Sequence, residues 1–147
     1  MRLAAVALAS LALGTLPRVA AAGEGGDCTY LEIAATSEKA PAIDAELQPL
    51  EKKLKKPPFS SWNTFHKLSG GDLSLAKSKA EALHLKQGGA SVILRERTPQ
   101  KVELGITVDG TDGKRVIDTK PSLAVGDWLL FVNNAGDDGH ILGLSCK

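Results

Sequence analysis

The chain has few aromatic residues and almost no net charge, and each shortage argues against a class of binding protein. Aromatic residues make up 4% of the 147 positions, and the 18 basic residues nearly balance the 17 acidic ones. A balanced charge provides no extended basic surface, so nucleic acid is not expected as a partner. A saccharide-binding face built from several coplanar rings is also disfavoured.

The common catalytic and metal-binding motifs are missing as well. The sequence contains no G-x-S-x-G turn, H-E-x-x-H helix, phosphate-binding glycine loop or C-x-x-C pair. Three histidines, His66, His84 and His140, fall on separate predicted strands. We therefore predict no catalytic residue, metal site or cofactor. A triad assembled from remote residues stays open because triads are defined by geometry, and His66 is then the histidine to test first.

Only the N-terminus carries a long apolar run. Arg2 precedes small and apolar residues over 3–16, and Ala20, Ala21 and Ala22 follow before Gly23. The run is shorter than the roughly twenty residues of a membrane-spanning helix, and the alanines are typical of signal-peptide cleavage. We expect residues 1–22 to be a signal peptide and residues 23–27 a flexible leader. The protein is then secreted or periplasmic, without a transmembrane segment after cleavage.

Cysteine occurs twice, at Cys28 and Cys146, close to the two ends of the expected mature chain. Both residues survive cleavage, and an oxidising compartment favours their pairing. The resulting loop spans nearly the whole mature chain, for which the chain-entropy estimate has an upper value of about 5 kcal/mol. We predict a structural disulfide that joins the first and last strands.

The sequence after residue 58 has the period of short β-strands separated by glycine and proline turns. In 102–108, apolar and polar residues alternate, as in a strand with one buried face, and 29–35 alternates in the same way. Gly70-Gly71, Gly88-Gly89 and Asp112-Gly113 are interpreted as turns. Strands are expected over 29–35, 62–68, 73–77, 82–86, 91–97, 102–108, 115–119, 128–133 and 140–146.

This pattern predicts one mainly β domain over residues 28–147. Short strands without alternating helices are typical of an antiparallel β-sandwich or open barrel, here of about eight strands. One helix is expected between the first strand and the others, because its apolar residues are spaced four, three and four apart: Ile43, Leu47, Leu50 and Leu54. Asp44 or Ser37 is its expected cap, and we place it on the sheet, across an open end or edge.

Residues 56–65, Lys-Pro-Pro-Phe-Ser-Ser-Trp-Asn-Thr-Phe, are the most distinctive stretch of the mature chain. On this block and the helix before it, the chain resembles small exported bacterial proteins without an assigned activity, which implies a shared mainly β build. Phe59 and Phe65 are expected to fill the core where the helix meets the sheet. The alternative is an exposed binding platform formed by Trp62 with Phe59 and Phe65, which would hold a sugar ring or a peptide.

Two loops, 109–113 and 133–140, combine carboxylates with glycines. Carboxylates can ligate calcium, but Asn, Asp and Gly are also selected in turns for their backbone conformations. Neither loop is expected to hold a metal.

These patterns predict a non-enzymatic interaction or structural protein of the bacterial envelope or exterior, whose partner is an unknown protein or envelope component. Two alternatives stay open: a small secreted hydrolase with a sheet-borne histidine, and a carrier of an apolar ligand between the sheets. A hydrolase needs polar groups that converge in a cleft, and a carrier needs an apolar cavity. An interaction protein needs an exposed patch or sheet edge.

Cleavage is predicted after Ala22, because small residues occupy the positions that a signal peptidase reads, Ala20 and Ala22. Intact-mass analysis of the exported protein should therefore give the mass of residues 23–147. A mass that includes residues 1–22, or a lipid on Cys28, would contradict this prediction.

Overall fold

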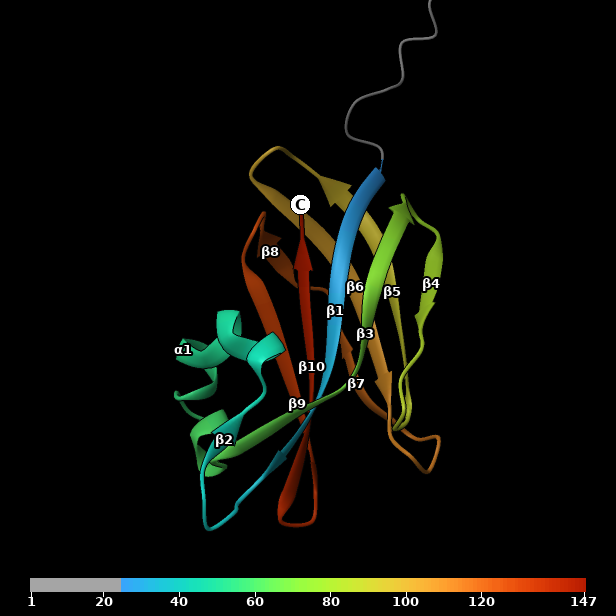
Figure 1. Ribbon diagram of the computed structural model, residues 1–147. Helices are drawn as coiled ribbons and strands as arrows, with labels where there is room; N and C mark the ends of the chain where they lie inside the picture. Colours follow the sequence, from blue (N-terminus) through green and yellow to red (C-terminus); the bar gives the residue numbers. More distant parts are fainter. Residues whose placement is uncertain (1–24) are drawn as a thin grey trace, which may run out of the picture.

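The computed structural model describes residues 25–147, apart from the side chains of Asn134 and Ala135, and shows a mainly β protein with two sheets (Figure 1). The expected signal peptide, 1–22, lies outside the described residues. Within the described part, no helix has the length and apolar character needed to cross a membrane.

The terminal sheet contains both ends of the described chain. Its strand order is β2 (Ala42–Ile43), β3 (Thr64–Ala76), β1 (Gly25–Thr36), β10 (Asp138–Cys146) and β9 (Trp128–Ala135). All neighbours are antiparallel except β2 and β3, which are parallel. The first and last strands therefore lie side by side in the centre of this sheet, as the sequence predicted.

The second sheet is formed by the middle of the chain. Its order is β4 (Ala80–Leu83), β5 (Gly89–Arg97), β6 (Lys101–Asp109) and β7 (Arg115–Thr119), and β8 (Ser122–Ala124) also pairs with β6. In β6, Val102, Leu104, Ile106 and Val108 are buried and alternate with half-exposed residues. The strand with the clearest alternation in the sequence is thus confirmed. The short β2 and β8 carried no recognisable pattern.

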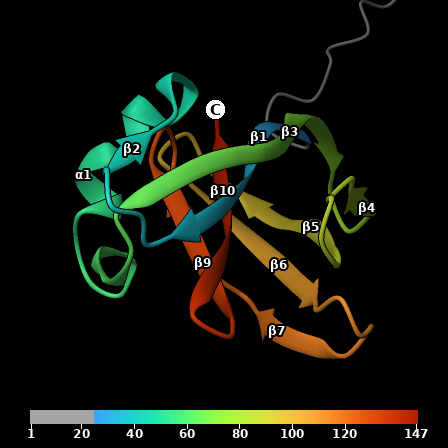
Figure 2. The ribbon, with the colours of Figure 1, turned by 60° about the horizontal axis from the view of Figure 1, so that its bottom comes forward.

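The terminal sheet has a separate core on each of its faces. Between the two sheets, Cys28 and Tyr30 of β1 pack with buried residues of β5, β6 and β10. On the outer face, Ile33 and Ala35 of the same strand pack against a helical segment. Figure 2 shows this segment on the side of the terminal sheet that is away from β5 and β6. The helical segment covers a sheet face rather than the open end or edge expected from the sequence.

The expected helix is broken into shorter pieces. Ile43 lies in β2, a 3₁₀ helix η1 follows over Ala45–Leu50, and the α-helix α1 has only the four residues Glu51–Leu54. Pro49 lies inside η1, and its missing N–H prevents one continuous α-helix. The apolar stripe is nevertheless kept, because both helix types bring every third or fourth residue to one side. Its buried members are Leu47, Leu50 and Leu54.

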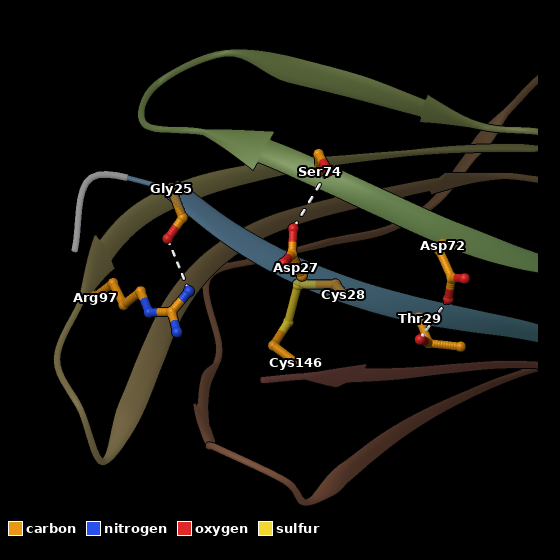
Figure 3. The surroundings of a disulfide bond; sticks show 8 residues. All are labelled: Gly25, Asp27, Cys28, Thr29, Asp72, Ser74, Arg97 and Cys146. Atoms are coloured by element: carbon orange, nitrogen blue, oxygen red, sulfur yellow. Dashed lines mark hydrogen bonds between the residues drawn. A yellow bond between two sulfur atoms is a disulfide. The ribbon is translucent and has the colours of Figure 1, made fainter. Parts of the chain in front are cut away.

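The predicted disulfide is present. Cys28 and Cys146 are direct partners in the register of β1 and β10, and their Cα atoms are 4.0 Å apart (Figure 3). The residues before Cys28 are not a flexible leader from Gly25 onward, because β1 begins there. Arg97 Nη1 donates to the Gly25 carbonyl at 2.7 Å, and this contact ties the start of β1 to β5.

Gly70 and Gly71 are not a turn, contrary to expectation. Both lie inside β3, where a Cβ on Gly70 would approach the Tyr30 carbonyl oxygen to 2.9 Å. A Cβ on Gly71 would lie 3.1 Å from the Tyr30 ring. The glycines therefore allow β3 to approach Tyr30 of its neighbour β1 closely, and two expected strands form one strand of 13 residues. At Gly88 and Gly113 the predicted turns are confirmed, with φ of 71° and 79°.

Leu47→Ala should lower the free energy of unfolding by about 2 to 4 kcal/mol, because it removes buried methyl groups and leaves a cavity under η1. Glu51→Ala is the control on the same segment and should change it by less than about 0.5 kcal/mol, since Glu51 makes only an exposed ion pair with Lys55. Denaturant unfolding of the three proteins measures both effects. Equal losses would mean that the buried face has been misplaced.

Candidate functional site

The aromatic residues of the 56–65 block belong to the outer core of the terminal sheet. Phe59 lies in a short 3₁₀ helix, η2 (Phe59–Ser61), and is half-buried, whereas Phe65 is 2% exposed in β3. Trp62 is 9% exposed, and its Nε1 donates to the Asp137 carbonyl at 2.8 Å. The exposed aromatic platform is therefore wrong. The core role expected for Phe59 and Phe65 is confirmed.

The position of Trp62 depends on a glycine in the last hairpin. A Cβ on Gly139 would lie 2.7 Å from the indole ring, so only glycine lets β10 approach the ring this closely. Together with the bond to Asp137, this contact fixes the ring against the β9–β10 hairpin. Trp62 is consequently bonded to a residue 75 positions farther along the chain, Asp137.

A groove of about 470 Å³ borders this core, between β2 and the helical segment. Trp62 and Phe65 line it, together with Ile43 of β2 and Leu54 of α1, so its walls contain apolar side chains. Phe59 is not among its lining residues. The groove thus borders two of the three aromatic residues predicted to bind, although Phe65 is 2% exposed and Trp62 is 9% exposed, so only a small part of either ring reaches it.

The rim of the groove is polar but has no excess charge. Glu51 and Lys55 of α1 form an ion pair at 2.6 Å. The Asn63 side chain accepts from Glu38 N–H and donates to Glu38 C=O, both at 2.9 Å, which fixes the loop between β1 and β2. Gln48 adds an amide to the rim. These groups suit a neutral ligand that carries both donors and acceptors.

A second polar constellation surrounds Glu32, which is fully buried in β1. Its Oε2 accepts hydrogen bonds from the Ser69 hydroxyl of β3 and, at 2.7 Å, from the Lys86 N–H. Its Oε1 accepts from the Gln87 N–H at 2.8 Å and lies 2.9 Å from Nε2 of His140 in β10. Because Lys86 and Gln87 connect β4 to β5, this carboxylate links the two sheets.

Two opposing effects act on the pKa of Glu32. Burial raises it, because a carboxylate in the protein interior loses its hydration. The hydrogen bonds from Ser69, from His140 and from two backbone amides favour the charged form and outweigh burial, so the pKa lies below its ordinary value of 4.5. Glu32 is therefore a buried carboxylate at neutral pH, with each of its oxygens hydrogen-bonded.

The order of contacts around Glu32 differs from that of a catalytic triad. In a triad the histidine contacts the hydroxyl and removes its proton, whereas here the Ser69 hydroxyl donates directly to Glu32. His140 is 9% exposed and contacts the other carboxylate oxygen. The arrangement positions strands and loops around the carboxylate and does not activate Ser69.

His66, the histidine chosen from the sequence, is exposed and forms a pair with Asp44. The His66 Nδ1 lies 2.8 Å from Asp44 Oδ1, and Asp44 Oδ2 accepts from the Lys67 N–H at 2.8 Å. These bonds hold the pKa of Asp44 below its ordinary value and replace the helix-capping bond expected for its side chain. No serine or threonine hydroxyl is hydrogen-bonded to His66 within residues 25–147.

The acidic loops act as turns where they are described. Asp112 Oδ1 accepts from the Lys114 N–H at 3.0 Å, and Asp109 pairs with Arg115 at 3.0 Å. Over the described residues, no group of three or more His, Cys, Asp or Glu side chains is placed to hold a metal ion.

Sequence reasoning missed the Glu32 cluster, although one signal was available. Cys28, Tyr30 and Glu32 share one face of β1, and the cysteine and tyrosine on that face indicate that it is buried. The partners of Glu32 carry no comparable signal, because Ser69, Lys86 and Gln87 lie in polar stretches.

Glu32→Gln should lower the free energy of unfolding at neutral pH by about 2 to 4 kcal/mol, since it disrupts a buried, charge-assisted network. The folded pKa lies below the unfolded one, so the carboxylate stabilises the fold above 4.5 and loses this effect as the pH falls through the folded pKa. The difference between the two proteins should therefore shrink as the pH is lowered below 4.5. Denaturant unfolding at several pH values measures it.

Glu103→Gln, which changes a half-exposed residue of β6, is the control and should change the free energy of unfolding little at any of these pH values. A difference between wild type and Glu32→Gln that does not vary with pH would contradict the role given to the Glu32 charge.

Comparison with known proteins provides no relative whose activity bears on these residues. No family model matches the chain, and searches among curated proteins and among solved structures found no match. A functional proposal for this chain therefore rests on the geometry of its described residues.

Proposed function

We propose that the protein is an exported, non-enzymatic binding protein of the bacterial envelope or exterior, and that it binds an extended peptide segment of a partner protein in the groove beside Trp62. The observation that carries this proposal is the groove itself, which places apolar walls next to an open strand edge. The disulfide supports export, because such bonds persist in oxidising compartments.

The backbone of β2 favours a peptide as the ligand. Ala42 N–H donates at 3.2 Å to the carbonyl of Asn63, directly before β3, and Asp44 N–H donates at 3.1 Å to the Phe65 carbonyl in β3. The direction of backbone groups alternates along a strand, so the N–H and C=O of Ile43, which lies between them, are directed away from β3. Ile43 also lines the groove. An extended peptide can therefore hydrogen-bond to this edge while one of its side chains enters the hollow.

The walls and the rim define the chemistry of that peptide. Half-buried Ile43 and the accessible edge of Trp62 offer apolar contact, which suits an aliphatic or aromatic side chain, while the nearly buried Phe65 and Leu54 support the wall from behind. The Glu51–Lys55 pair and Gln48 present both donors and acceptors without net charge, so a neutral peptide segment is preferred to a strongly charged one. A single pocket beside a two-residue strand implies modest affinity and a short recognised sequence.

Ala42→Trp should weaken peptide binding by at least about tenfold, because a large ring at exposed Ala42 obstructs the groove without removing a core residue. Ala124→Trp is the matched control, at an equally exposed alanine in another short strand, and should change affinity by less than about twofold. A peptide is first selected from a displayed random library on the wild-type protein, and a synthetic copy is then titrated against all three proteins.

Circular dichroism and thermal melting establish that both variants are folded. Selection of no peptide, or equal binding by the two tryptophan variants, would contradict the proposal.

The hydrolase alternative has one supporting observation, the exposed pair of His66 and Asp44. Such a pair can polarise a histidine for general-base chemistry when substrate or water supplies the proton. Turnover of ester, peptide or glycoside substrates that is lost in His66→Ala would favour a hydrolase and overturn the binding proposal. A carrier has no comparable support, because buried side chains of both sheets pack against one another in the space it would use.

A further inference from the structure

β9 is a border strand of the terminal sheet with apolar side chains on both faces. Among the described strands it is hydrogen-bonded only to β10, so its other side presents free backbone groups. Six consecutive residues, 128–133, are half-buried. Figure 2 shows β9 with the helical segment on one side and β7 on the other.

Each face of β9 continues one of the two cores. Trp128, Leu130 and Val132 pack against the core beneath the helical segment. Leu129 and Phe131 pack against the core between the sheets. Both cores therefore reach the surface along this strand, and a partner that covers β9 can extend both of them at once.

The other border strands are protected by charge or by their short length, and β9 is not. Glu81 of β4 pairs with Lys79, and β7 carries Arg115 and Asp118. β2 has two residues and β8 has three. β9 has eight residues, Trp-Leu-Leu-Phe-Val-Asn-Asn-Ala, with no charge and no proline. Proteins usually avoid such an edge because it pairs readily with another strand.

The chemistry of β9 makes a second copy of itself a suitable partner. Antiparallel pairing about a two-fold axis perpendicular to the sheet keeps each face on its own side. If the axis passes beside Leu130, this residue lies opposite Leu130 of the second copy. Trp128 of each copy then lies opposite Val132 of the other, and Leu129 lies opposite Phe131. Every directly opposed pair in this stretch is apolar and none brings like charges together. On β7, Arg115 and Asp118 leave no comparable uncharged stretch.

We propose that β9 is a dimerisation edge, through which two copies of this chain join their terminal sheets into one continuous antiparallel sheet. This contact is separate from the groove beside Trp62, which lies at β2, at the opposite border of the same sheet. The two contacts therefore use different strands of the sheet, and a dimer formed through β9 contains two copies of the groove.

The first test is the mass of the purified protein in solution, in the processed form that intact-mass analysis finds. Light scattering after size exclusion should give twice the chain mass at about 100 µM and dissociation on dilution. Leu130→Lys places like charges together at the two-fold axis and should raise the dissociation constant at least about tenfold. Val116→Lys, at a 44% exposed residue of β7, is the control and should leave the dimer intact.

The second test needs no variant and remains decisive if Leu130→Lys fails to fold. Hydrogen exchange of the wild-type protein should show protection of 128–133 that increases with protein concentration, whereas protection of β7 stays constant. A single-chain mass at all concentrations, or exchange in β9 that is independent of concentration, would overturn the proposal. A folded Leu130→Lys variant that dimerises as strongly as the wild type would overturn it as well.

Discussion

The buried carboxylate of Glu32 is the interaction on which the join between the two sheets depends. It receives hydrogen bonds from β3, from β10 and from the connection between β4 and β5, so one side chain holds three parts of the chain in place. A buried charge is tolerated only when such donors replace its lost hydration. The donors must therefore converge on Glu32, which makes the relative position of the two sheets specific.

The disulfide joins β1 and β10, the two strands that also carry Glu32 and His140, near the start of β1 and at the end of β10. Cys28 and Cys146 are paired partners in β1 and β10, and the Glu32–His140 contact joins these strands again farther along. Between the two contacts, β1 alternates between the two cores, with Tyr30 facing the second sheet and Leu31 facing the helical segment. The central strand pair is thus fixed by covalent, polar and apolar contacts together.

This rigid centre leaves the two borders of the terminal sheet available for interactions. At one border, β2 is short and stands beside a groove whose walls include Trp62. At the other, β9 is long, apolar and uncharged. If both proposals hold, one border binds a peptide and the other joins two copies, so that the dimer presents two peptide sites.

Local periodicity in the sequence was sufficient to predict the mainly β class, most strands and the disulfide. These features depend on neighbouring residues, as in the alternation of 102–108, or on two cysteines with no other partner. Local patterns also misled where another part of the chain intervened. Gly70-Gly71 is typical of a turn in the sequence, but both residues lie inside β3, where the close approach of Tyr30 in β1 leaves little room for a larger side chain.

Only the tertiary structure decided where the polar network, the groove and the open edge lie. The side chains bonded to Glu32 are 37 and 108 residues away, and the Trp62 ring depends on Gly139 in another hairpin. The sequence determined which residues alternate and which can pair. The packing of distant strands determined which of those residues are enclosed, because burial is a property of the assembled sheets and not of the local chain.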